Sequence, residues 1–193
     1  MTDSVVIDPR VRRTRLLLKK ALGRLLETKE FSKISVQDVA EAATLNRATF
    51  YDHYPDKFAL LDSMVADRFN ELLSKRAVVY DGGCSSALKA IVLGVCDFLA
   101  ATPRLEREQQ AQVQPHLESA VIGIVQKMFL VGLELHRESS VPIEIIATAA
   151  SWAIYGAAKQ WIHTPDRCSS EAIADVIMVL VTPILTSKPL ATT

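Results

Sequence analysis

Two residues near the N-terminus have the chemistry needed to read the edges of DNA bases. Arg47 and Thr49 fall on the outer side of a short predicted helix that begins after Asn46. An arginine can donate two hydrogen bonds to guanine O6 and N7, and a threonine can offer its hydroxyl group or place its methyl group against thymine. For Arg47 a phosphate contact or a salt bridge to Asp52 stays open as an alternative. The pattern therefore predicts a base-reading surface.

Two short helices joined by a tight turn must position this surface. Ser35 can cap the first helix, with Asp38 three residues later, which is close to the capping-box pattern. Asn46 can cap the second helix, and Pro55 ends it. The apolar residues of both helices have the three-four spacing of buried helical faces: Val36, Val39, Ala40, Ala43, Ala48, Phe50 and Tyr54. This arrangement predicts a helix-turn-helix, whose second helix can enter the major groove.

Charge is distributed unevenly along a chain that is neutral overall. The 193 residues contain 22 Lys and Arg and 22 Asp and Glu, but residues 10–57 carry 11 basic and 6 acidic side chains. A helix predicted from Arg10 to about Thr28 has a broad leucine face that includes Leu16 and Leu17. Arg12 and Arg13 lie in its first turns, where cations are unfavourable. A nearby DNA phosphate would explain their position, and solubility is the alternative.

Residues from about Arg12 to Leu61 resemble the DNA-binding domain of TetR-family transcriptional regulators. The similarity is carried by the run TFYDHYPDK at residues 49–57, followed by Leu60 and Leu61. The resemblance implies that Tyr51 and His53 hold phosphates. Lys57 falls at a helix N-terminus, where backbone N–H groups also favour an anion. Further backbone-phosphate donors are Ser35 and Thr44, with cap and turn roles as alternatives, and Asn46 completes the predicted DNA-binding set.

The sequence departs from the family pattern at two positions. Thr44 stands in the turn where the family usually has glycine, and Glu30 stands before Phe31 where glycine is also common. Because a β-branched residue is costly at positive φ, the turn is expected to have a different shape, which would affect the angle of the second helix.

Helical periodicity extends through the rest of the chain, and no segment alternates apolar and polar residues as a half-buried strand does. We predict an all-α fold of about nine helices. Residues 10–56 form the helix-turn-helix domain and residues 57–190 a helical ligand-binding and dimerisation domain. Helices are expected to start at Ser85 or Ser86, at Pro115, at Pro142, and after Ser169 or Ser170, with a break at Asp81-Gly82-Gly83.

The composition favours a cytoplasmic protein without a cofactor. The three cysteines have no metal-ligand spacing and suit reduced thiols. The N-terminus lacks the apolar core of a signal peptide, and the apolar stretch Ile145–Ala158, with 14 uncharged residues, is shorter than a membrane span. No GxSxG, HExxH, GxGxxG or phosphate-binding loop is present, so we predict no enzymatic activity.

The last two predicted helices are candidates for a homodimer interface, because a symmetric dimer can read a palindromic operator. Close helix approach and an apolar stripe would come from Ala153, Gly156, Ala157, Val176, Ile177, Leu180, Val181 and Ile184. Packing of both helices within a monomer is the alternative. The TetR resemblance implies a small-molecule effector in the C-terminal domain. Candidate pocket residues, for which core packing is the alternative, are Cys96, Phe98, His116, Met128, Phe129, Trp152 and Tyr155.

These predictions describe a transcriptional repressor that a small-molecule effector releases from its operator. Two alternatives remain open from the sequence. One is a TetR-like protein whose C-terminal domain binds a protein partner, and the other is a transcriptional activator.

Overall fold

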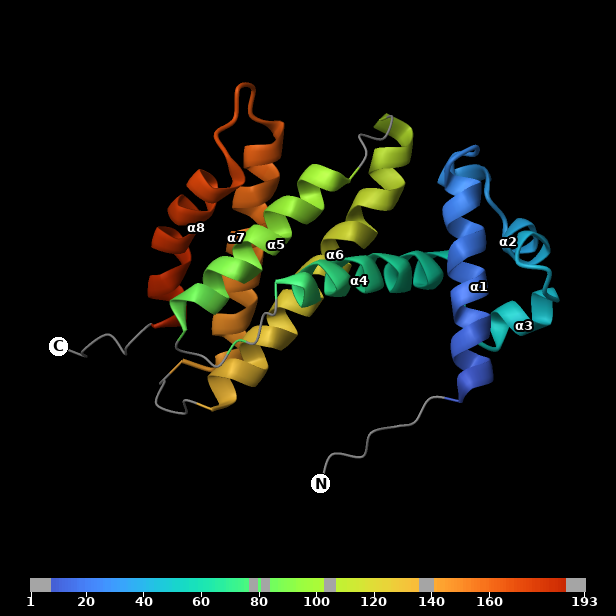
Figure 1. Cartoon of the computed structure of the whole chain (residues 1–193), viewed down its shortest axis with the longest axis horizontal. Helices are drawn as coiled ribbons and strands as arrows, with labels where there is room; N and C mark the ends of the chain where they lie inside the picture. The colour runs from blue at the N-terminus through green and yellow to red at the C-terminus, as the bar shows by residue number, and fades with distance from the viewer. Residues whose placement is uncertain (1–7, 77–79, 81–83, 103–106, 136–140, 187–193) are drawn as a thin grey trace. The chain divides into compact units, whose positions relative to one another are not determined.

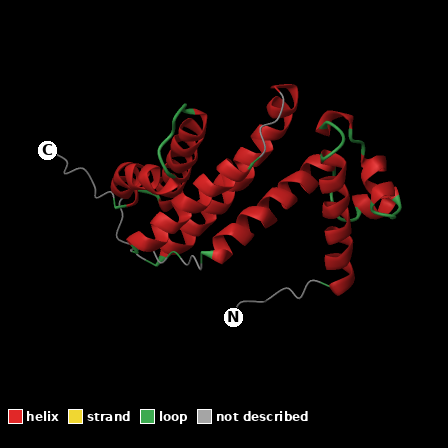
Figure 2. Ribbon diagram, turned by 45° about the horizontal axis from the view of Figure 1, so that its top comes forward, coloured by secondary structure: helices red, strands yellow, loops and turns green. Residues whose placement is uncertain are grey.

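The chain folds into helices throughout the part that the computed structural model describes, which is residues 8–76, 80, 84–102, 107–135 and 141–186. Eight α-helices lie within these described residues (Figure 1), which contain no strand (Figure 2). The α-helices are α1 (Pro9–Leu26), α2 (Val36–Ala42), α3 (Arg47–Tyr51), α4 (Lys57–Lys75), α5 (Ser85–Ala101), α6 (Arg107–Glu134), α7 (Ile143–His163) and α8 (Ser170–Leu185). A 3-10 turn, Phe31–Lys33, precedes α2. The predicted all-α fold is confirmed.

Packing divides the chain into two compact units. The N-terminal unit comprises residues up to Val65 together with Leu105–Leu117, and the C-terminal unit comprises Ala66–Arg104 and Glu118–Thr193. Helices α4 and α6 therefore each begin in the N-terminal unit and end in the C-terminal unit. This division into packing units differs from the domain limits predicted from the sequence, 10–56 and 57–190. Those limits stay a prediction.

The N-terminal unit is held together by the packing of α1 against α2 and of α2 against α3. Its core contains Leu18, Leu22, Val39, Phe50 and Leu60, all fully buried. The predicted leucine face of α1 is narrower than the sequence indicated. Leu16 and Leu17 are 51% and 37% exposed, because the buried stripe follows Leu18, Ala21 and Leu22 instead.

In the C-terminal unit α5, α7 and α8 pack against one another, and they lie side by side in both views (Figures 1 and 2). Close approach between α4 and α5 depends on Gly94, where a Cβ atom would lie 2.8 Å from Leu73 Cδ2. Any larger residue at this position would force Leu73 to move.

Several predicted helix starts differ from the structure. The N-cap of α5 is Cys84, without a side-chain cap bond, so Ser85 and Ser86 both lie inside the helix. Pro115 lies inside α6 rather than at its first position. Of the two caps predicted for α8, Ser169 is the N-cap, since its Oγ accepts from Ala172 N at 3.2 Å. The predicted break at residues 81–83 lies outside the described residues.

The stretch Val113–Glu134 of α6 meets the length and composition of a membrane span, with a mean hydropathy of 1.3. A core helix of a helical domain meets the same two criteria. This helix therefore carries no argument for a membrane location.

Candidate nucleic-acid interface

A complete capping box starts α2. Asp38 N donates to Ser35 Oγ at 3.1 Å, and Ser35 N and Oγ both donate to Asp38 Oδ2, at 2.8 and 2.6 Å. These bonds, and then the Lys29 ammonium, lower the pKa of Asp38 to about 2. Both donors of Ser35 are thus engaged within the domain, so the structure supports its cap role over the predicted phosphate contact.

A Schellman motif closes α2 and forms the turn. Leu45 N donates to Ala40 O and Thr44 N to Glu41 O, both at 2.9 Å, which is the pair of bonds that defines this motif. Thr44 occupies its left-handed position with φ 57°. The turn therefore keeps the backbone that glycine usually provides there, and the shape change expected from Thr44 is absent at this residue. The cost is local backbone strain in an exposed threonine.

Helix α3 is docked by one face and exposed on the other. Asn46 Oδ1 accepts from Ala48 N at 2.9 Å and so caps the helix as predicted. Phe50 is fully buried, whereas Arg47 and Tyr51 are exposed and Thr49 and His53 are partly exposed. The four predicted contact residues on α3 and directly after it are therefore accessible to a partner.

Arg47 and Tyr51 are paired on this exposed face. Arg47 Nη2 donates to Tyr51 Oη at 3.1 Å, and the guanidinium carbon lies 5.5 Å from the centre of the Tyr51 ring. The sequence had offered Asp52 as an intramolecular partner for Arg47, but the structure gives it Tyr51. Residues four apart are neighbours on a helix surface, which makes this pairing local.

Lys57 has a structural role that the sequence did not reveal. Its ammonium donates to the carbonyl oxygens of Phe31, Ser32 and Ile34 at 2.9, 3.2 and 2.7 Å. It also lies 4.7 Å from the centre of the Phe31 ring. An ammonium has three donors, and all three are used here. This placement contradicts the prediction that Lys57 holds an anion, since its donors fasten α4 to the turn before α2.

Two other residues that the sequence analysis did not single out support the helix-turn-helix. Arg24 Nη2 donates to Ala42 O at 3.1 Å and so satisfies a carbonyl at the end of α2. The Lys29 ammonium lies 3.1 Å from Asp38 Oδ1. The predicted contacts Arg12 and Arg13 are exposed in the first turns of α1, which Asp8 caps by accepting from Arg10 N.

Comparison with known proteins identifies this N-terminal unit. A sequence profile described as bacterial regulatory proteins of the tetR family matches residues 18–64. Over these residues the chain is therefore similar to TetR-family regulators. Two curated relatives match over 68 residues, or 35% of this chain. They are the uncharacterized HTH-type transcriptional regulator YxbF of Bacillus subtilis, 41% identical over 18% of its length, and the HTH-type transcriptional regulator EthR of Mycolicibacterium smegmatis, 43% identical over 28% of its length.

The chain thus spans less than a third of the length of these curated relatives. Similarity to solved structures extends further. The multidrug binding protein EbrR, crystallised with imidazole, is 15% identical, with a TM-score of 0.55 and full coverage of both chains. A TetR-family regulator from Shewanella sp. PV-4 is 15% identical, with a TM-score of 0.52 over 87% of this chain and 95% of the other. At these identities the likeness shows the fold alone, which this chain shares with both proteins.

The predicted effector-pocket residues differ in their burial. Cys96, Phe98, Phe129 and Tyr155 are buried in the C-terminal unit, but Trp152 is 53% exposed. Trp152 therefore does not belong to an enclosed pocket. Burial, and then the charge of Asp97, raises the pKa of the Cys96 thiol to about 12, and burial also raises the pKa of Tyr155.

His116 was predicted to belong to the effector pocket of the C-terminal domain, but it packs in the N-terminal unit. Its Nδ1 lies 2.8 Å from Asp62 Oδ1, and its ring stacks on Phe58 with 4.7 Å between ring centres. The sequence placed these residues more than fifty positions apart, so no local signal revealed the pairing. This contact corrects the predicted pocket.

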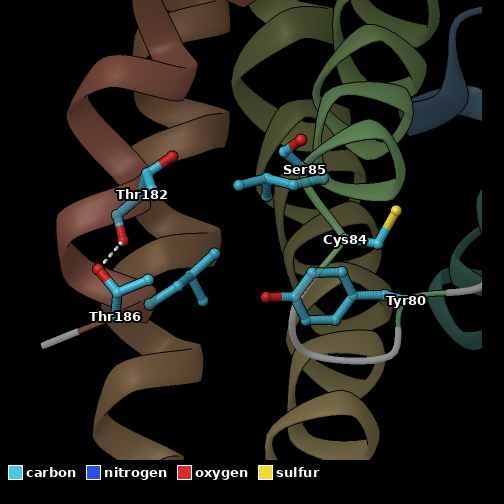
Figure 3. Close-up of a pocket in the computed structure, with 7 residues that line it drawn as sticks. Tyr80, Cys84, Ser85, Thr182 and Thr186 are labelled. Atoms are coloured by element: carbon cyan, nitrogen blue, oxygen red, sulfur yellow. Dashed lines mark hydrogen bonds between the residues drawn. The ribbon is translucent and has the colours of Figure 1, made fainter.

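A small cavity lies elsewhere in the C-terminal unit, between the start of α5 and the end of α8 (Figure 3). Its volume is about 80 Å³, well below the roughly 300–1,000 Å³ of sites for drug-sized ligands. None of the seven predicted pocket residues lines it. The lining is Tyr80, Cys84, Ser85, Leu88, Thr182, Leu185 and Thr186. Figure 3 shows the Thr186 hydroxyl bonded to the Thr182 carbonyl, so this polar group is already satisfied.

The predicted dimer residues divide into two groups. Ile177 and Val181 are fully buried, so they belong to the core of the unit and not to a surface. Val176 and Leu180 are 54% and 59% exposed, and Gly156 is exposed on α7. Partly exposed positions are Ala153, Ala157 and Ile184. The exposed apolar surface of α7 and α8 also includes Trp152 and Val179.

Proposed function

We propose that this chain is a sequence-specific DNA-binding transcriptional regulator in which α3 reads the major groove. The observation that carries the proposal is the exposed polar face of α3, with Arg47 at its start, on a helix-turn-helix that the TetR-family profile matches. Bidentate contact of Arg47 with guanine would favour the correct base by about 1–3 kcal/mol. Arg12, Arg13, Asn46 and His53 would contact the phosphate backbone, which fixes register without reading sequence.

The protein acts in this proposal as a homodimer on a palindromic operator. Support comes from the exposed apolar surface of α7 and α8, where Val179 is 73% and Leu180 59% exposed. Such a surface favours burial against a second copy. Two α3 helices would then read two half-sites whose spacing the dimer sets.

The proposal also includes regulation, in which a small-molecule effector releases the repressor from its operator. The side chains proposed for the effector site are Cys96, Phe98, Phe129 and Tyr155, which are buried, and Met128, which is partly exposed. The raised pKa values keep the Cys96 thiol and the Tyr155 hydroxyl neutral, so this core suits an apolar, uncharged effector. The effector acts only through different affinities for the DNA-binding and released states. A regulator of this kind works in the cytoplasm, where the DNA is.

A binding titration with DNA flanking the protein's own gene tests the proposal. Fluorescence anisotropy at several salt concentrations, with random competitor, should show saturable binding at two protomers or a multiple per site. Binding should weaken steeply with salt, because phosphate contacts release counterions. If a random DNA pool also yields no enriched sequence, the DNA-binding proposal is wrong, and a protein partner becomes the better hypothesis.

Two matched pairs of variants sharpen this test. Arg47→Ala should abolish base preference, whereas Arg167→Ala removes an exposed charge from the C-terminal unit and should leave the preference intact. Leu180→Asp should dissociate the dimer in analytical ultracentrifugation. Val131→Asp, at a position 63% exposed on α6, should not. If Arg47→Ala still discriminated fully between operator and random DNA, Arg47 would not be the residue that reads the base. Repressor and activator are distinguished by a reporter gene behind the enriched sequence.

A further inference from the structure

The contacts of Arg47 assign a function to Tyr51 that differs from phosphate binding. Tyr51 is held from inside the domain. Its ring makes an edge contact with Phe50 at 5.6 Å between ring centres, and Phe50 is fully buried. Tyr51 is nevertheless 46% exposed, and the hydrogen bond to its hydroxyl is exposed on the face of α3 that would meet DNA. The buried Phe50 thus supports the Tyr51 ring on the outer face of α3.

Arg47 takes its orientation from this ring. Its Nη2 donates to Tyr51 Oη at 3.1 Å while the guanidinium lies 5.5 Å from the ring centre. An exposed arginine otherwise samples many rotamers, and that freedom is lost when it binds. Two simultaneous contacts with one neighbour restrict the side chain before any DNA arrives.

The hydrogen bond also limits how Arg47 can donate. A guanidinium carries five N–H donors arranged as two two-donor edges, and Nη2 contributes one hydrogen to each edge. Donation from Nη2 to Tyr51 therefore occupies one edge and leaves one complete edge free. A single two-donor edge is what the O6 and N7 acceptors of guanine require.

We propose that Tyr51 is a positioning residue that sets sequence specificity, because it holds Arg47 with one edge directed at a guanine in the major groove. This inference rests on the proposed function, since it concerns the same DNA-binding surface. Tyr51 acts through Arg47 and touches neither the base nor a phosphate itself.

The test compares Tyr51→Phe, Arg47→Ala and the double variant by selection from a random DNA pool, followed by anisotropy on single-base operator variants. Tyr51→Phe keeps the ring and its contact with Phe50 but removes the hydroxyl. Tyr54→Phe is the matched control, because its hydroxyl bonds to Ser63 Oγ, away from Arg47.

Tyr51→Phe should reduce discrimination between bases about three- to tenfold, which corresponds to the loss of one hydrogen bond. The reduction should occur at the same base pair where Arg47→Ala relaxes the preference. The double variant should discriminate no worse than Arg47→Ala alone, because the two residues act as a unit. Tyr54→Phe should keep the wild-type preference.

Three results would overturn the inference. A uniform loss of affinity for operator and random DNA would make Tyr51 a phosphate contact. Relaxation at a base pair other than that of Arg47 would make it an independent base contact. Unchanged preference in Tyr51→Phe would leave the hydroxyl without a role in recognition. If the wild-type protein itself enriches no sequence, the proposed function fails first, and that outcome is seen before any variant is compared.

Discussion

Replacing Lys57 by methionine should destabilise the N-terminal unit by about 2–4 kcal/mol. The bonds from its ammonium to the carbonyls of Phe31 and Ile34 are part-buried, and the bond to Ser32 is exposed. Leaving a buried acceptor without its donor costs about 1–3 kcal/mol. We take about 1–2 kcal/mol for each part-buried carbonyl and nothing for the exposed one, because water can replace the ammonium there.

Hydrogen exchange measured by mass spectrometry is the suitable assay. Both tryptophans, Trp152 and Trp161, belong to the C-terminal unit, so intrinsic fluorescence would not report on unfolding of the N-terminal unit. Peptides from α2 and α3 should exchange roughly 30- to 1,000-fold faster in Lys57→Met, which corresponds to about 2–4 kcal/mol. Lys75→Met is the control. Lys75 makes an exposed pair with Glu71 on the same helix, and such pairs contribute about 0–1 kcal/mol.

DNA binding provides the second readout for Lys57. Under conditions where Lys57→Met remains folded, the dependence of affinity on salt should match that of the wild type, because no phosphate contact is lost. The reasoning is refuted if exchange rates match those of Lys75→Met while the salt dependence falls by about one counterion. That pair of results would return Lys57 to the phosphate-binding set.

Three further predictions follow from single residues. Thr44→Gly should stabilise the N-terminal unit by about 0.5–1 kcal/mol, since glycine removes a left-handed strain of about 1–2 kcal/mol but adds entropy to the unfolded chain; a lower urea midpoint would contradict this. Because the folded pKa of Asp38 is depressed to about 2, its contribution is present above its ordinary pKa of 3.8 and is lost as pH falls from about 5 towards 2. Asp38→Asn should flatten the pH dependence of unfolding in that range. At pH 8 a thiol reagent should modify the exposed Cys84 and Cys168 quickly and Cys96 only on unfolding. Rapid modification of all three thiols in the folded protein would refute the burial of Cys96.

Features encoded by short sequence separations were predictable. The caps at Ser35, Asn46 and Ser169 were identified because a cap and its helix lie within three residues of each other. The all-helical fold followed from apolar periodicity. The exposed face of α3 followed from the same pattern, since Phe50 had to be buried.

Features that depend on distant residues were not predictable. The carbonyls that Lys57 contacts lie 23 to 26 positions earlier in the chain, so its position at the start of a helix suggested an anion site instead. His116 and Asp62 are 54 positions apart. Thr44 shows a third limit, because side-chain preference alone argued against a backbone conformation that the Schellman hydrogen bonds nevertheless maintain.

Recognition and stability are separable in α3, and this bears on how its specificity can change. A helix of five residues is far too short to persist alone in water. It persists because the Asn46 cap and buried Phe50 anchor it from the side that faces the core. Arg47 contributes to neither anchor, and its contact with the Tyr51 hydroxyl lies on the exposed face. Arg47→Ala, and Tyr51→Phe, which keeps the ring contact with Phe50, should therefore alter which DNA sequence is preferred while leaving the unfolding free energy within about 0.5 kcal/mol of the wild type.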